Sequence, residues 1–148
     1  VCPSLDTLPQ EVKAEKIGKM SMIWVAATEH YVHKRSGEFD DSAREKYRII
    51  AIADTAREQP ALSINIIQKQ PRLTVTNFTA KVEALTAGLG IGTLPRQIAL
   101  PLIEKGVLKQ IEDTEEQPMD IILAWRRNTM GEAKSWCIQY LKKNWKLK

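Results

Sequence analysis

Short, strongly apolar runs alternate along this chain with segments whose apolar residues recur at helical spacing. The run from Met22 to Ala27 is almost continuously apolar and has the length of a strand, which favours a strand covered on both faces. We expect residues 12–18 to form a strand or the approach to one, and residues 19–28 to form a second strand. Further strands are predicted at 48–53, 72–76, 91–94, 107–111 and 119–125.

Two helices are expected between these strands. Asp40 or Asp41 can cap a short helix that continues to Tyr47. Asn77 can cap a second helix, and Gly88 stands where a left-handed C-terminal cap belongs. The apolar face of this second helix is predicted to consist of Phe78, Val82, Leu85 and Leu89.

Two more helices are expected towards the C-terminal end. Pro95 is well placed in the first turn of the third helix, and Gly106 ends it. Pro101 predicts a break near Leu100, because proline cannot donate a backbone hydrogen bond inside a helix. The last helix is predicted to bury Ala133, Trp136, Cys137, Tyr140 and Leu141. Strands that alternate with helices predict the α/β class.

The composition is that of a folded, water-soluble protein, with 43% apolar and 27% charged residues. Residues 126–148 carry seven basic and one acidic side chain (+6), whereas the rest carry 15 and 17 (−2). This distribution favours a solvated basic tail over a nucleic-acid-binding stripe. The longest apolar stretch is strand-length and the first residues lack a secretory signal, so no membrane contact is expected. Cys2 and Cys137 lie far apart, which predicts free thiols and a cytoplasmic location.

No combination of residues in the sequence predicts catalysis or a cofactor. Gly88, Gly90 and Gly92 follow a helix and lead into a strand, whereas a dinucleotide-binding loop follows a strand and opens a helix. His30 and His33 could ligate a metal from one helical turn, but no third ligand clusters with them, so surface histidines are expected. A nucleophile with its base and acid is also missing. The sequence therefore predicts a protein that is not an enzyme and holds neither metal nor cofactor.

Residues 72–95 resemble the effector-binding domain of LysR-type transcription regulators. In that family a strand ends in a polar residue, a helix ends in A-G-x-G-I or A-G-x-G-V, and a short strand leads to L-P. In this chain Ala87–Ile91 and Leu94-Pro95 supply the last two motifs, and Gly106–Leu108 matches the G-x-L that follows. Weaker similarity continues at 23–30 (V-A-x-x-x-H, with Tyr31 for the usual proline), 47–50, 122–126 and the last helix.

The resemblance implies a periplasmic-binding-protein-like (type 2) fold with two Rossmann-like subdomains, the first of them incomplete. Residues 1–28 are expected to be a remnant of subdomain I, 29–116 to form subdomain II, and 117–148 to return to subdomain I. A winged helix-turn-helix, a linker helix and the first elements of subdomain I would precede Val1. The resemblance thus implies a homo-oligomeric regulator, a dimer or tetramer, that meets DNA only through the preceding domain.

In this family a small-molecule effector binds in the cleft between the subdomains, and loops at strand ends match its contact positions. Ligands of open α/β sheets bind beyond the carboxyl ends of the strands. A helix that begins at Asn77 also offers N–H groups and positive potential to an anion, so we expect a polar or anionic metabolite. The expected effector-binding residues are Thr28, Ala53, Asp54, Thr55, Arg57, Thr76, Asn77 and Phe78.

Three alternatives stay open from the sequence. In the first, Asn77 caps the helix without contacting an effector, and in the second, Arg57 is an exposed charge of a loop. The same architecture also serves transport-related solute-binding proteins, which would need an export signal upstream of Val1.

Overall fold

The computed structural model describes residues 2–3, 9–53, 67, 69–127 and 131–145. The chain divides into two compact units, one made of residues 1–22 with 117–148 and the other of residues 23–116. In chain order the elements are β1 (Cys2–Pro3), β2 (Val12–Ala27), η1 (Tyr31–Lys34), α1 (Asp41–Arg44), β3 (Ile49–Ile52), β4 (Arg72–Val75), α2 (Phe78–Thr86), β5 (Ile91–Pro95), α3 (Arg96–Glu104), β6 (Leu108–Gln110), β7 (Gln117–Arg126) and α4 (Glu132–Asn144). Strands alternate with helices as the α/β prediction requires, and the fold class is confirmed.

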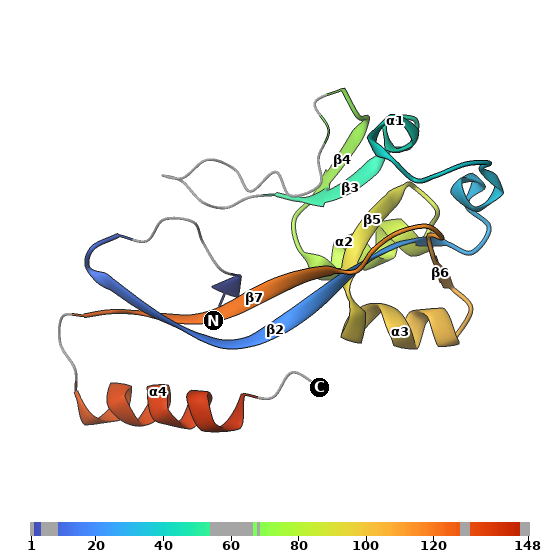
Figure 1. The fold of residues 1–148 in the computed structure, drawn as a ribbon. Coiled ribbons are helices and arrows are strands. Elements are labelled where there is room, and N and C mark those ends of the chain that lie inside the picture. Colours follow the sequence, from blue (N-terminus) through green and yellow to red (C-terminus); the bar gives the residue numbers. More distant parts are fainter. Residues whose placement is uncertain (1, 4–8, 54–66, 68, 128–130, 146–148) are drawn as a thin grey trace. The chain divides into compact units, whose positions relative to one another are not determined.

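The first unit is built on a long antiparallel ribbon of β2 and β7 (Figure 1). Pairing runs from Val12↔Arg126 to Met22↔Gln117, with a shift of register between Lys16 and Gly18. The predicted strands 12–18 and 19–28 are therefore one strand, because the irregularity at Gly18 is absorbed as a bulge instead of ending the strand. The two residues of β1 pair with the other edge of β7.

Helix α4 of the first unit presents a different face from the one predicted. Trp136 and Tyr140 are 63% and 52% exposed, and their rings stack on each other with centroids 5.0 Å apart. The half-buried apolar positions are Ile138 and Leu141, which have the same helical spacing. The predicted buried stripe is wrong because α4 carries apolar residues on two faces, and spacing alone does not tell which face is covered.

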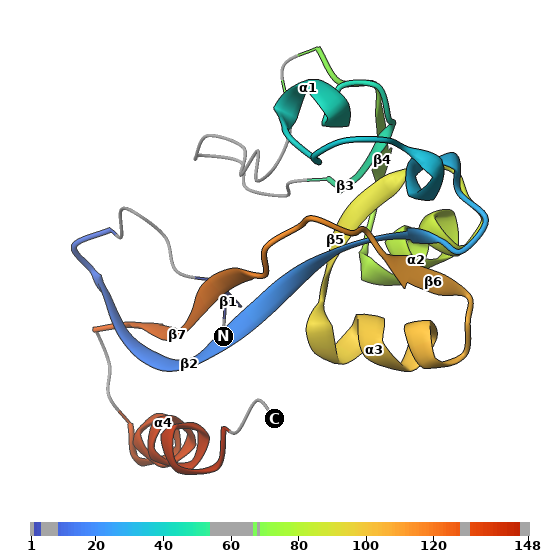
Figure 2. The same cartoon turned by 45° about the vertical axis from the view of Figure 1, so that its right-hand side comes forward.

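The second unit is a sheet in which β3 lies between β4 and β5, with parallel pairing on both sides (Figure 2). On the other side of β5 comes the end of β2, which pairs antiparallel with β6. This end of β2 is covered on both faces, as predicted. Ile23 and Val25 join the core formed with α2 and α3, whereas Trp24 and Ala26 join a second core with Val32 and Phe39. The alternation of side chains along a strand separates the two cores.

The buried face of helix α2 differs from the apolar face that was predicted for it. Leu85 is fully buried, but Phe78 and Leu89 are 45% and 47% exposed. The buried positions are Lys81, Ala84 and Leu85, so a lysine occupies one place of the inward face. The predicted left-handed cap is confirmed, because Gly88 has φ +72°.

Three local predictions are corrected. Helix α3 continues through Pro101, so the predicted break near Leu100 does not occur. Pro101 is exposed, and the helix loses only the one hydrogen bond that the missing N–H of proline would donate. The short helix capped by Asp40 ends at Arg44 instead of Tyr47, whose side chain packs in the second core. His30 is buried, with 7% of its surface exposed, although a surface position was expected.

Candidate functional site

The carboxyl ends of β3 and β4 lie side by side in the second unit. Ile52 and Val75 are partners in the parallel register, and the Ala53 N–H donates to the Val75 carbonyl over 2.7 Å. The strand tips Ala53 and Thr76 are thereby brought to one edge of the sheet. The predicted contact residues Asp54, Thr55 and Arg57, which follow in the sequence, lie outside the described residues.

The N-terminus of α2 begins at this same edge. The Asn77 side-chain oxygen accepts a hydrogen bond from the Ala80 N–H over 2.9 Å, and the Asn77 amide donates to the Thr76 hydroxyl over 3.4 Å. Asn77 is therefore a helix cap, as one alternative held, and Phe78 beside it is 45% exposed. The first turn of α2 contains no acidic residue that would offset the positive potential of the helix N-terminus.

Thr28 does not belong to this edge. Its hydroxyl donates to the Gly106 carbonyl over 2.6 Å, and it lines a hollow with Thr86, Ala87 and Gly88. Those residues form the C-terminal end of α2, and the nine residues of this helix span about 13 Å. The structure thus brings together Ala53, Thr76, Asn77 and Phe78 and leaves Thr28 at the opposite end of the helix.

Lys81 is a residue of this region that the sequence reasoning missed. It lies one turn into α2 and only 8% of its surface is exposed. Burial lowers the pKa of its ammonium group from 10.5 to about 8. A Cβ on Gly92 would lie 3.2 Å from the Lys81 Cε, so the glycine makes room for the lysine chain against β5. The signal in the sequence is that Lys81 precedes the buried Leu85 by four residues and so shares its face.

Arg96 stands at the third strand tip, directly after β5. Because β5 pairs parallel with β3, Arg96 comes at the same carboxyl edge as Ala53. Its guanidinium forms an ion pair with Glu116, which already satisfies part of its charge. The sequence signal for Arg96 is its place after the strand that ends in L-P.

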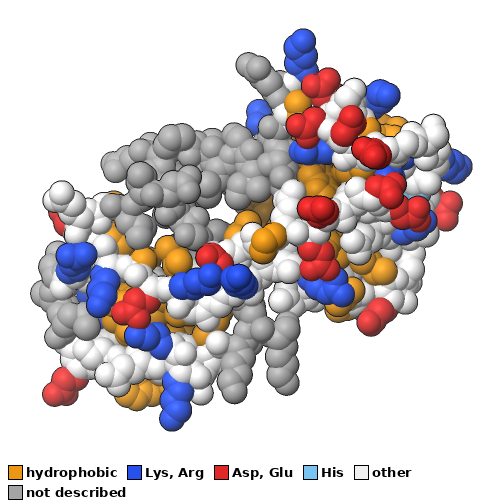
Figure 3. All heavy atoms as spheres, in the orientation of Figure 1, with side chains coloured by type: hydrophobic (Ala, Val, Ile, Leu, Met, Phe, Trp, Pro, Cys, Tyr) orange, Lys and Arg blue, Asp and Glu red, His pale blue; other side chains and the backbone are white. Residues whose placement is uncertain are grey.

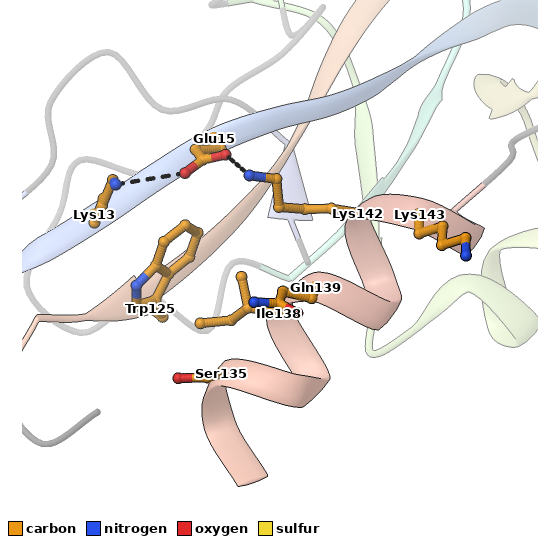
Figure 4. Close-up of a pocket in the computed structure, with 8 residues that line it drawn as sticks. All are labelled: Lys13, Glu15, Trp125, Ser135, Ile138, Gln139, Lys142 and Lys143. Carbon is orange, nitrogen blue, oxygen red and sulfur yellow. Dashed lines mark ion pairs between the residues drawn. The ribbon is translucent and has the colours of Figure 1, made fainter. Parts of the chain in front are cut away.

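Two other hollows are lined by residues outside this edge of the sheet. In the first unit, a hollow of about 530 Å³ lies between α4 and the ribbon (Figure 4). Glu15 there pairs with Lys142 and, at 3.5 Å, with Lys13, and the hydrogen bond from Lys142 is the main cause that lowers the pKa of Glu15. In the second unit, acidic side chains gather over the part that carries α1 (Figure 3), and a smaller hollow there is lined by Glu38, Phe39, Asp40 and Asp113. In the part of the chain that is described, no three His, Cys, Asp or Glu side chains gather to hold a metal ion.

The two histidines serve the structure of the second unit. The His30 Nδ1 accepts a hydrogen bond from the Val32 N–H over 3.1 Å, and burial is the main cause that lowers the pKa of His30. The His33 Nε2 lies 3.1 Å from the Ala27 carbonyl oxygen. Because a carbonyl oxygen can only accept a hydrogen bond, this nitrogen carries the proton and donates it. Burial is the main cause that lowers the pKa of His33, helped by Lys109 and Arg35 and opposed by the hydrogen bond to the Ala27 carbonyl and by Glu112. Both rings are therefore held neutral near pH 7.

The fold is of the periplasmic-binding-protein-like type 2 class, which is the fold of LysR regulatory domains. Solved structures of the same fold include the regulatory domain of the LysR family regulator MetR from Neisseria meningitidis, with a TM-score of 0.70, 16% identity, and 95% of this chain and 67% of that chain covered. Full-length Vibrio cholerae virulence activator AphB gives a TM-score of 0.67 with 16% identity, over 93% of this chain and 49% of that chain.

Residues 3–146 match the LysR substrate binding domain family, and the chain belongs to that family. The probable HTH-type transcriptional regulator YhaJ of Escherichia coli K12 is 42% identical over 133 residues, which are 90% of this chain and 45% of YhaJ. The HTH-type transcriptional regulator PunR of the same organism is 27% identical over 126 residues, 84% of this chain and 41% of PunR. The chain thus spans less than half the length of these relatives. The family match favours a regulator over the solute-binding protein that the sequence had left open.

Proposed function

We propose that this chain is the effector-sensing domain of a LysR-type transcription regulator, and that the effector binds at the carboxyl edge of β3 and β4. The observation that supports this most is the convergence of Ala53, Thr76 and the capped N-terminus of α2 at one edge of a parallel sheet. Ligands of open α/β sheets bind at this edge, where helix N-termini offer N–H groups.

In this proposal the domain performs no chemistry on its ligand. The effector stabilises one conformation of the domain over another, and a helix-turn-helix domain of the whole regulator responds with altered DNA affinity.

The whole regulator acts in the cytoplasm as a homo-oligomer. The proposed subdomain assignment is 1–28 and 117–148 for the first subdomain and 29–116 for the second. In the structure the compact units divide at Met22–Ile23 instead of at Thr28. Among the described helices none is long and apolar enough to cross a membrane.

A thermal-shift screen of the chain with metabolites tests the proposal. An effector raises the melting temperature by linkage, and at 100 times its Kd the stabilisation is about 2.7 kcal/mol. The Thr76→Val variant should reduce this shift, because it removes the hydroxyl at the strand tip while keeping the shape of the side chain. Thr74→Val is the matched control, since Thr74 is exposed on the same strand two residues earlier. If an effector raised the melting temperature equally in the wild type and in both variants, its site would lie elsewhere in the chain.

A further inference from the structure

A hollow lies at the C-terminal ends of α2 and α3, away from the edge of β3 and β4 proposed for the effector. Its volume is about 510 Å³, within the range of about 300–1,000 Å³ that is typical of small-molecule sites. Three segments of the second unit meet around it, which are the end of β2 with the start of η1, the end of α2 and the end of α3. We call it the helix-end hollow, and its lining includes Thr28, Glu29, Tyr31, Thr86, Gly88 and Gly106.

The two helices that end at this hollow have no basic residue in their last turns. Both leave the helical conformation through a left-handed glycine, Gly88 with φ +72° after α2 and Gly106 with φ +71° after α3. The C-terminal end of a helix carries about half a negative charge, because its last carbonyls have no partner within the helix. By contrast, α1 ends with Arg44, and α4 ends with Lys142 and Lys143. Among the described α-helices, the two without a basic last turn are therefore the two that meet here.

The side chains around the helix-end hollow add negative charge. Glu29 is exposed in the lining and takes part in none of the ion pairs of the described residues. No lysine or arginine is among the described residues that line the hollow, and Lys105, which follows α3, is exposed outside the lining. His30 belongs to the lining, but burial lowers its pKa and leaves its ring neutral near pH 7. The electrostatic potential of the hollow therefore favours a cation.

An aromatic ring and an aliphatic side chain offer contacts to the uncharged part of a ligand. Tyr31 is 57% exposed, yet its ring stacks on His30 with centroids 4.5 Å apart and its hydroxyl donates to the Lys46 carbonyl over 3.4 Å. Val107 also lines the hollow and is 43% exposed. The exposed ring of Tyr31 is thus held in place, and the face of an aromatic ring attracts a cation.

We propose that the helix-end hollow binds a small organic cation, an ammonium or guanidinium group on a short apolar body. The cationic group lies at the ends of α2 and α3 beside Glu29, and the apolar body packs on Tyr31 and Val107. This site is separate from the proposed effector site, because the length of the nine-residue helix α2, about 13 Å, lies between them. The proposal therefore holds whichever effector binds at the edge of β3 and β4.

The test is a titration of ¹⁵N-labelled chain with phenethylammonium chloride, butylammonium chloride and agmatine, followed by backbone amide shifts. Sodium chloride at equal ionic strength is the reference, and 2-phenylethanol is the neutral compound of the same shape as phenethylammonium. The amines should cause saturable shifts at Thr28, Glu29, Gly88 and Gly106. Phenethylammonium should bind about fivefold more tightly than 2-phenylethanol or better, because only the cation gains from the helix ends and Glu29.

Substitutions in the lining complete the test. Thr86→Lys supplies a basic residue in the last turn of α2 and should weaken amine binding about fivefold or more. Thr86→Gln, which adds length without charge, is its control and should change the affinity less than about twofold. Glu29→Gln should weaken binding about two- to fivefold, whereas Glu38→Gln, at an exposed acid outside this hollow, should not.

Several results would overturn the proposal. One is the absence of saturable shifts at the hollow with all three amines, and another is equal binding of phenethylammonium and 2-phenylethanol. Equal amine affinity in the wild type and Thr86→Lys would also do so. Loss of amine binding in Thr76→Val would place the cation at the proposed effector site instead. If the amide signals of the hollow shift with the concentration of the chain alone, the hollow holds a side chain of a second copy, and a free amine is the wrong ligand.

Discussion

Removing the buried charge of Lys81 should make this protein more stable. Moving a lysine pKa from 10.5 to about 8 corresponds to about 3 kcal/mol of destabilisation at neutral pH, since each pKa unit is about 1.4 kcal/mol. Methionine has a similar length and no charge, so Lys81→Met should raise the free energy of unfolding by about 2–3 kcal/mol. Such a gain moves the urea midpoint upwards by about 1–2 M for a chain of this size.

The pH dependence of this effect has a defined sign. Between pH 8 and 10.5 the unfolded chain holds a proton on Lys81 that the folded chain has released, so wild-type stability rises with pH over this range. The advantage of Lys81→Met should therefore be largest below pH 8 and shrink towards pH 10.5. Urea titrations followed by circular dichroism measure it, with Lys105→Met as the control for loss of an exposed lysine. A Lys81→Met variant that is less stable than wild type at pH 7 would refute the reasoning.

Substitutions at Gly90, Asn77 and His30, with their controls, test the local structure by the same urea titration. Gly90→Ala should destabilise by on the order of 3 kcal/mol or more, because the new Cβ would overlap the Arg48 carbonyl oxygen. At Gly131, the N-cap of α4, a new Cβ meets nothing, and Gly131→Ala should cost only about 1 kcal/mol or less. Asn77→Ala should cost about 1 kcal/mol by removing the cap of α2, and Asn77→Asp should restore most of it; equal stability of all three would contradict the capping role. Stability of the wild type should fall as the pH drops below about 6.5, because the unfolded chain then binds protons that buried His30 resists. His30→Asn, which keeps an acceptor for the neighbouring N–H, should weaken this dependence, and an unchanged slope would assign it to other groups.

The part of the fold that the sequence predicts well depends on local geometry. Alternating Leu73 and Val75 predicted β4, and Gly88 predicted the left-handed end of α2, because each signal comes from the backbone conformation of a few neighbouring residues. The grouping of Ala53 with Thr76 came from the resemblance to LysR-type regulators, whose contact positions match these two strand ends. In the parallel register of β3 and β4 the two strand ends lie at one edge of the sheet.

The predictions that failed depended on contacts distant in sequence. Which of two apolar faces of α4 is covered is decided by the ribbon, and helical spacing carries no information on it. Lys81 was overlooked because charged residues are normally assigned to the exposed face, yet the glycine on β5 makes room for it. Thr28 was grouped with the strand tips from an assumed crossing point, but β2 has already entered the second unit at Ile23.

The most direct measurement is a map of backbone amide shifts in ¹⁵N-labelled chain on titration with an effector from the thermal-shift screen. The account predicts that the largest changes fall at Ala53 and at residues 76–81, around the strand tips and the first turn of α2. Changes concentrated instead at Thr28, Gly88 and Gly106, or in the hollow beside Trp125, would place the ligand elsewhere and contradict the account.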